Sequence, residues 1–73
     1  MPWLPADVGG LKVGDIVRRG PGWGFGSQDG KPGALGTVME LRPDGEACTV
    51  AWDCGGRYSY EAGHGRRGDL EVF

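Results

Sequence analysis

The chain has 73 residues, with 8 basic and 10 acidic side chains and a formal net charge of -2. A chain of this length forms one domain and buries only about 60% of the surface that it exposes when unfolded, so most of its large apolar side chains are needed in the core. The charges are interspersed, which argues against broad electrostatic attraction to nucleic acid or anionic lipid. The apolar runs are too short to span a bilayer and the Met-Pro-Trp start lacks a signal-peptide pattern, so we expect no membrane insertion.

Glycine recurs along the whole chain, and no segment between glycines keeps a helical period, so we expect an all-β protein. Residues 1–12 contain Pro2 and Pro5, which disfavour helix and strand, and are interpreted as a lead-in segment to a domain over residues 13–73. Short β-type runs predict five strands, at residues 13–18, 35–42, 46–53, 57–61 and 69–73. Five short strands with tight turns favour a small, strongly bent sheet or partly open barrel.

Two tight turns connect the later strands. Pro43-Asp44-Gly45 has the residues of a hairpin turn, because proline presets φ and glycine accepts a positive φ. Residues 53–56 predict a second turn. Alternation along the strands places Val50 and Trp52 on one face. The predicted core residues are Val38, Val50, Trp52 and Leu70.

The segment between the first two strands, residues 20–34, is long for a compact domain, and such loops are often functional. It carries Trp23 and Phe25 among glycines. Two residues apart in extended backbone, both rings point to one side, so they either fold back as a lid over an open end of the sheet or line an exposed groove. Gln28 and Asp29, followed by Gly30, are interpreted as bracing the loop through an Asx-type turn.

The motifs in this region resemble a known family. Arg19-Gly20-Pro21, Trp23, Gln28-Asp29-Gly30 and Gly36-Thr37-Val38 are similar to the signature of the Mind bomb/HERC domain family, and the match continues through Trp52-Asp53, Gly55, Tyr60, Gly63 and Asp69-Leu70. The resemblance implies a small SH3-like β-barrel that occurs as a module in large E3 ubiquitin ligases. In Mind bomb proteins such domains help to recognise the cytoplasmic tails of Notch ligands. The module is not itself the transferase, and a zinc-binding ZZ finger often lies nearby in the parent chain.

This sequence departs from the family pattern at five positions: Gly22 replaces a usual Asp, Gly24 a common Lys, Phe25 a second Trp, Glu61 a frequent Arg and Gly68 an aromatic residue. Scaffold residues are retained where exposed ones have changed, so we expect the fold to carry over but not a particular ligand. We assign Trp23 to bracing the loop. We assign Phe25, Tyr58, Tyr60 and Arg57 to a peptide-binding surface, where a peptide could also pair with a free strand edge.

No pattern indicates catalysis, a metal or a cofactor. Gly63 to Gly68 match the spacing of a dinucleotide-binding fingerprint, but that fingerprint needs a following helix, and only a short predicted strand follows. Cys48, Cys54 and His64 lack the spacing of a zinc site. A Cys54–His64 pair has no evident orienting group. We therefore expect the domain to be non-catalytic, with neither metal nor cofactor.

The two cysteines predict a reducing compartment. Cys48 and Cys54 lie on one extended run, which would hold their Cα atoms about 20 Å apart, beyond disulfide reach. Free thiols are typical of the cytosol or nucleus. We expect a cytoplasmic or nuclear module that is monomeric in isolation and binds a protein partner through a cytoplasmic tail or a substrate segment. The alternative is a reader of nucleic acid or of a modified tail, with Trp23, Phe25, Tyr58 and Tyr60 as stacking or cage residues.

Overall fold

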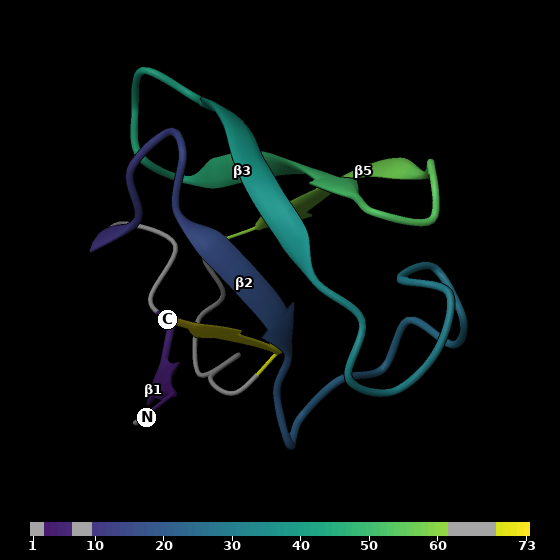
Figure 1. The fold of residues 1–73 in the computed structure, drawn as a ribbon. Coiled ribbons are helices and arrows are strands. Elements are labelled where there is room, and N and C mark those ends of the chain that lie inside the picture. Colours follow the sequence, from purple (N-terminus) through teal and green to yellow (C-terminus); the bar gives the residue numbers. More distant parts are fainter. Residues whose placement is uncertain (1–2, 7–9, 62–68) are drawn as a thin grey trace.

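The computed structural model describes residues 3–6, 10–61 and 69–73. Six strands form one antiparallel sheet within these residues (Figure 1). They are β1 (Leu4–Pro5), β2 (Ile16–Arg19), β3 (Gly36–Leu41), β4 (Ala47–Trp52), β5 (Arg57–Glu61) and β6 (Leu70–Val72). The strand order is β1-β6-β2-β3-β4-β5. The all-β prediction is confirmed, and no described segment forms a helix long and apolar enough to cross a membrane.

The sheet differs in two ways from the expected five-stranded barrel. First, its order is open, because no described strand joins the outer edges of β1 and β5. The strands are nevertheless strongly twisted against one another, and β4 and β5 cross behind β3 in Figure 1. Second, a short strand that was not predicted lies near the N-terminus, where Leu4 pairs with Val72 and Pro5 with Glu71. Proline is tolerated there because β1 is an edge strand, where a missing N–H need not cost a ladder bond.

Both predicted turns are present. In the β3–β4 turn, the Gly45 N–H donates to the Arg42 carbonyl over 2.9 Å and Gly45 has a φ of 74°. The Asp44 carboxylate accepts the Glu46 N–H over 2.9 Å, and this bond is the main reason why the pKa of Asp44 is lowered. In the β4–β5 turn, Gly55 has a φ of 107°. Glycine is required at both positions because side chains rarely accept such angles.

A β-bulge in β3 decides which side chains reach the interior. Val38 pairs with Val50, but the next pairing joins Glu40 to Thr49, so Met39 is an extra residue in the strand. The bulge shifts the alternation by one residue. Val38 and Leu41 therefore both contact the core although they are three apart, while Met39 is exposed.

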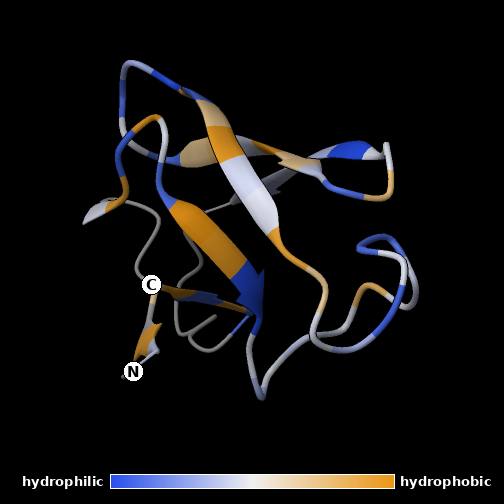
Figure 2. Ribbon diagram, in the orientation of Figure 1, coloured by the Kyte–Doolittle hydropathy of each residue, from blue (hydrophilic) through white to orange (hydrophobic). Residues whose placement is uncertain are grey.

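The core lies on the concave side of the sheet and contains the four residues predicted for it, all less than 4% exposed. Four further buried residues belong to the same cluster: Leu11, Val17, Cys48 and Tyr60. Figure 2 shows β2 changing from hydrophobic to hydrophilic along its length. Its apolar half serves the core, and its second half delivers Arg19 to the start of the long loop.

Candidate functional site

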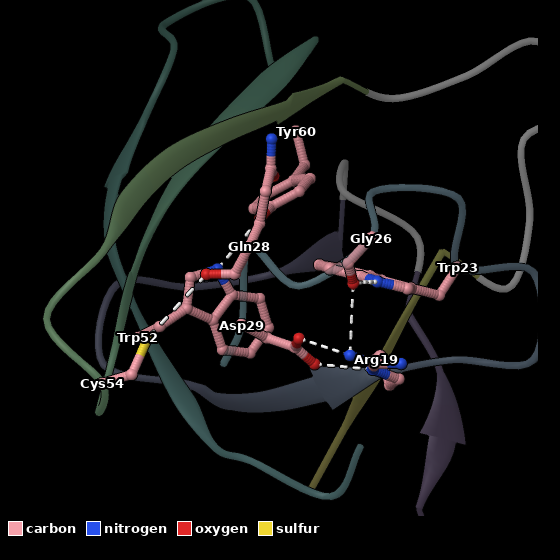
Figure 3. A network of polar contacts seen from close by, with 8 residues as sticks. All are labelled: Arg19, Trp23, Gly26, Gln28, Asp29, Trp52, Cys54 and Tyr60. Atoms are coloured by element: carbon pink, nitrogen blue, oxygen red, sulfur yellow. Dashed lines mark hydrogen bonds and ion pairs between the residues drawn. The ribbon is translucent and has the colours of Figure 1, made fainter. Parts of the chain in front are cut away.

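The long loop between β2 and β3 is fixed to the sheet by a partly buried ion pair. The Arg19 guanidinium donates from Nε to Oδ2 of Asp29 over 2.7 Å and from Nη2 to Oδ1 over 2.6 Å (Figure 3). Asp29 is fully buried, and the two hydrogen bonds from Arg19 replace the contacts with water that its carboxylate loses on burial. The hydrogen bond with Asp29 also raises the pKa of Arg19. The loop is therefore an ordered part of the domain, with Asp29 placed at its anchor.

A shared carbonyl ties the first half of the loop to the same arginine. The Gly26 carbonyl oxygen accepts from Arg19 Nη2 over 3.2 Å and from the Trp23 indole N–H over 2.8 Å. The Arg19 guanidinium also lies 5.4 Å from the centre of the Trp23 ring, within cation–π range. Arg19 thus holds both halves of the loop, a role that the sequence analysis did not give it. Its only sequence signal was its place in the family motif.

The two loop aromatics pack into an edge-to-face cluster with the core. Ring centres lie 5.0 Å apart between Trp23 and Phe25, 5.0 Å between Phe25 and Tyr60, and 5.6 Å between Trp23 and Trp52. Both loop rings are partly buried and contact the core cluster, which is the arrangement expected of a lid. The rings also fill the space between one another, so no cage for a methylated ammonium is open among Trp23, Phe25 and Tyr60 in this structure.

Tyr60 links the core to the loop through its hydroxyl. The Trp52 indole N–H donates to the Tyr60 oxygen over 2.9 Å, and the Tyr60 hydroxyl donates to Gln28 Oε1 over 2.9 Å (Figure 3). The pKa of Tyr60 is raised to about 12, mainly because its hydroxyl is buried. Tyr60, which was predicted to lie at a peptide-binding surface, is only 2% exposed in the structure. Trp23 and Phe25 cover the ring, which alternation within the strand could not reveal.

The other predicted peptide-binding residues of β5 lie at the surface. Tyr58 is 40% exposed and Arg57 is exposed, on a strand whose outer edge pairs with no described strand. A Cβ at Gly56 would lie 2.7 Å from the Tyr58 ring and 3.3 Å from the Gln28 carbonyl oxygen. Tyr58 therefore sits beside the loop at the start of β5.

A depression lies between the second half of the loop and the β4–β5 turn. Its volume is about 580 Å³. Asp53 and Cys54 of the turn line one side, and the other side is lined by loop residues Asp29, Gly30, Lys31, Gly33, Ala34 and Leu35. The Cys54 thiol lies 3.8 Å from the Gln28 carbonyl oxygen, so the turn also contacts the loop beside the depression. The sequence analysis did not identify this surface, because it is made by a loop and a turn that are far apart in the chain.

Both cysteines are free thiols, Cys48 in the core and Cys54 at the surface, and burial raises the pKa of Cys48. No group of three or more metal-ligating side chains comes together among the described residues. His64 and the Gly63 to Gly68 segment, including Gly68, lie outside those residues, as does the side chain of Glu61.

Comparison with known proteins places the chain in a family. The sequence model of the Mib_herc2 family matches residues 14–73. The chain belongs to the Mib_herc2 family. This confirms the resemblance drawn from the loop motif and the glycines and aromatics around it.

The Mib_herc2 relatives include very long proteins. The chain is 43% identical over 63 residues to E3 ubiquitin-protein ligase HERC2 of Homo sapiens, a match that covers 85% of this chain and 1% of that protein. It is 38% identical over 69 residues to E3 ubiquitin-protein ligase MIB2 of Gallus gallus, covering 86% of this chain and 7% of that protein. The chain thus corresponds to one small module of each relative, and the module occurs in proteins named as E3 ubiquitin ligases.

Proposed function

We propose that this Mib_herc2 chain is a non-catalytic protein-interaction module of an E3 ubiquitin ligase, which binds a peptide segment of a substrate or partner. Two observations support the proposal. The two relatives described above are named as E3 ubiquitin-protein ligases, and the match covers 1% of one and 7% of the other. The chain also presents Tyr58 and Arg57 on an edge strand, where main-chain groups can pair with an extended peptide.

The proposal includes the finer features that the family resemblance implies. The strongly twisted sheet corresponds to an SH3-like barrel whose strand pairing leaves one side open. The domain works as a monomer in the cytoplasm or nucleus, and other domains of the parent ligase carry out ubiquitin transfer. Phe25 and Tyr58 provide apolar contacts to the peptide, and Arg57 provides a charged one.

The test is selection of peptides from a random display library on the immobilised chain, followed by nuclear magnetic resonance (NMR) titration of a selected peptide into the ¹⁵N-labelled chain. We expect the largest amide shifts at Arg57 to Ser59 and around Phe25. Tyr58→Ala should weaken binding by about 1–2 kcal/mol, as loss of an aromatic anchor commonly does. Met39→Ala is a matched control, because Met39 is also 40% exposed but belongs to the β3 bulge.

Failure to recover any peptide that binds more tightly than about 1 mM would contradict the interaction role. The catalytic part is tested separately. The chain, mixed with ubiquitin, adenosine triphosphate and the ubiquitin-activating and ubiquitin-conjugating enzymes, should form no more ubiquitin conjugates than the mixture without it.

A further inference from the structure

The depression between the loop and the β4–β5 turn has the features of a subsite for one side chain. We propose that it holds an aliphatic side chain of an extended partner segment, flanked on that segment by one acidic and one basic residue. This rests on the proposed function, and names the chemistry that its binding surface recognises. It adds an apolar contact in the second half of the loop to those proposed for Phe25 and Tyr58.

The shape of the depression suits backbone and side chain together. Its volume of about 580 Å³ exceeds that of one aliphatic side chain and lies within the range of ligand pockets. Gly30 and Gly33, with φ of 97° and 85°, place backbone without side chains along its loop side. A Cβ at Gly33 would meet no atom within 4 Å, so a partner's main chain can approach the backbone closely there. Leu35, 38% exposed, supplies apolar surface for the partner's side chain.

Two unpaired charges of opposite sign line the depression. Lys31 lies on the loop side and Asp53 on the turn side, and both are exposed. Neither side chain forms a hydrogen bond or an ion pair with any other described residue. A partner segment with an acidic residue on one side of its aliphatic residue and a basic residue on the other would complement both charges. The acidic residue would lie by Lys31 and the basic residue by Asp53, so the partner binds in one direction.

The walls are fixed before any partner binds. A Cβ at Gly30 would lie 3.1 Å from the Cys54 Cβ, so the loop rests directly against the turn. The Asp53 N–H donates to the Leu35 carbonyl over 2.9 Å, and the Arg19–Asp29 pair holds the loop just before Gly30. A preformed site loses less conformational entropy when it binds. Cys54, which lines the depression, lies four residues before Tyr58, so the subsite is close to the start of β5.

The test uses two blocked synthetic peptides, Gly-Ser-Glu-Leu-Lys-Ser-Gly and its charge-exchanged form Gly-Ser-Lys-Leu-Glu-Ser-Gly, titrated into the ¹⁵N-labelled chain. One of them should shift the amides of residues 30–35 and 53–54 and bind about three- to tenfold more tightly than the other, as two exposed ion pairs allow. The double variant Lys31→Glu with Asp53→Lys should invert that preference. Replacing the central leucine with serine should remove binding by the preferred peptide.

Equal affinities for the two peptides, an unchanged preference in the double variant, or undiminished binding of the serine peptide would each overturn the proposal. The ¹⁵N spectrum of the double variant shows directly whether it is folded, and the two single charge reversals serve if it is not. Library-selected peptides that shift β5 alone would refute the subsite while the interaction role stands. If no peptide binds at either place, both proposals fail.

Discussion

Gly36 provides the most direct test of how tightly this core is packed. It is buried at the start of β3, opposite Trp52. A Cβ built there would lie 2.6 Å from Trp52 Cε3 and 2.6 Å from Val50 Cγ1. Favourable carbon–carbon contacts are about 3.5–4.0 Å, so Gly36→Ala places one methyl group about 1 Å inside two buried side chains. Trp52 cannot easily move away, because its indole N–H is bonded to Tyr60.

The magnitude follows from two opposing effects. Overpacking of a well-filled core costs about 1–3 kcal/mol. Alanine regains about 0.5–1 kcal/mol within a strand, because it has less conformational freedom to lose than glycine. Since the methyl group meets two neighbours at once, we expect a net loss of about 1–2 kcal/mol in the free energy of unfolding. For a domain of this size that corresponds to a fall in Tm of roughly 4–16 °C.

The assay is thermal and urea unfolding followed by circular dichroism. Gly24→Ala is the matched control, because a Cβ at Gly24 meets no atom within 4 Å and this variant should stay within about 0.5 kcal/mol of the wild type. Combining Gly36→Ala with Val50→Ala should cost less than the two changes summed, since the smaller residue makes room for the methyl group. A Gly36→Ala protein with the same Tm as the Gly24→Ala control would refute the reasoning.

Four further predictions concern the loop and its anchors. In Tyr58→Phe the remaining tyrosine, Tyr60, should titrate by ultraviolet absorbance near pH 12. Because folding raises that pKa from about 10, the stability of the wild type should be intact below pH 10 and should fall as the pH rises towards 12. Tyr60→Phe should show a smaller fall. A Tyr60 titration midpoint near pH 10 would contradict the burial of its hydroxyl. Asp29→Asn should lower the Tm more than Asp44→Asn, which breaks an exposed pair, and equal melts would show that the partly buried ion pair is not the anchor. Trp23→Ala should destabilise by up to about 3 kcal/mol, since the ring is only partly buried. Phe25→Ala should retain a cooperative melt and bind the selected peptide more weakly, and unfolding of Phe25→Ala or unchanged binding would contradict that assignment.

Much of the sheet could be predicted from local pattern. The strand at residues 57–61 has the predicted bounds, and the others differ by one to three residues at their ends. The hairpin turn at Pro43-Asp44-Gly45 was predictable because its residues fix the backbone whatever surrounds them. The bulge at Met39 was not, since it depends on how β3 must bend over the core. β1 was missed for a related reason: its pairing with β6 comes from tertiary contact, not from strand propensity.

Residue roles in the candidate site were harder to predict than the strands. Tyr58 and Tyr60 share a strand face by alternation, yet one is 40% exposed and the other 2%. The difference comes from the long loop, whose Trp23 and Phe25 cover Tyr60 but not Tyr58. The Arg19–Asp29 pair spans the same loop, and a ten-residue separation within an irregular segment gives no periodic signal. Only a family motif that contained both residues pointed to it.

The position of these aromatic rings also bears on where a partner can bind. A chain this short needs its large side chains in the core, and the loop delivers Trp23 and Phe25 there as a cover over Trp52 and Tyr60. Trp23, whose indole is bonded to Gly26 and packs against Trp52, is poorly placed to leave the core and bind a ligand, and Phe25 offers a partner only its exposed part. What the loop leaves exposed is glycine backbone, Leu35 and the unpaired charges of Lys31 and Asp53, together with Tyr58 at the strand edge. Recognition by this module should therefore depend on backbone approach, one apolar side chain and charge order, and its specificity should change with Lys31 and Asp53 while its stability does not.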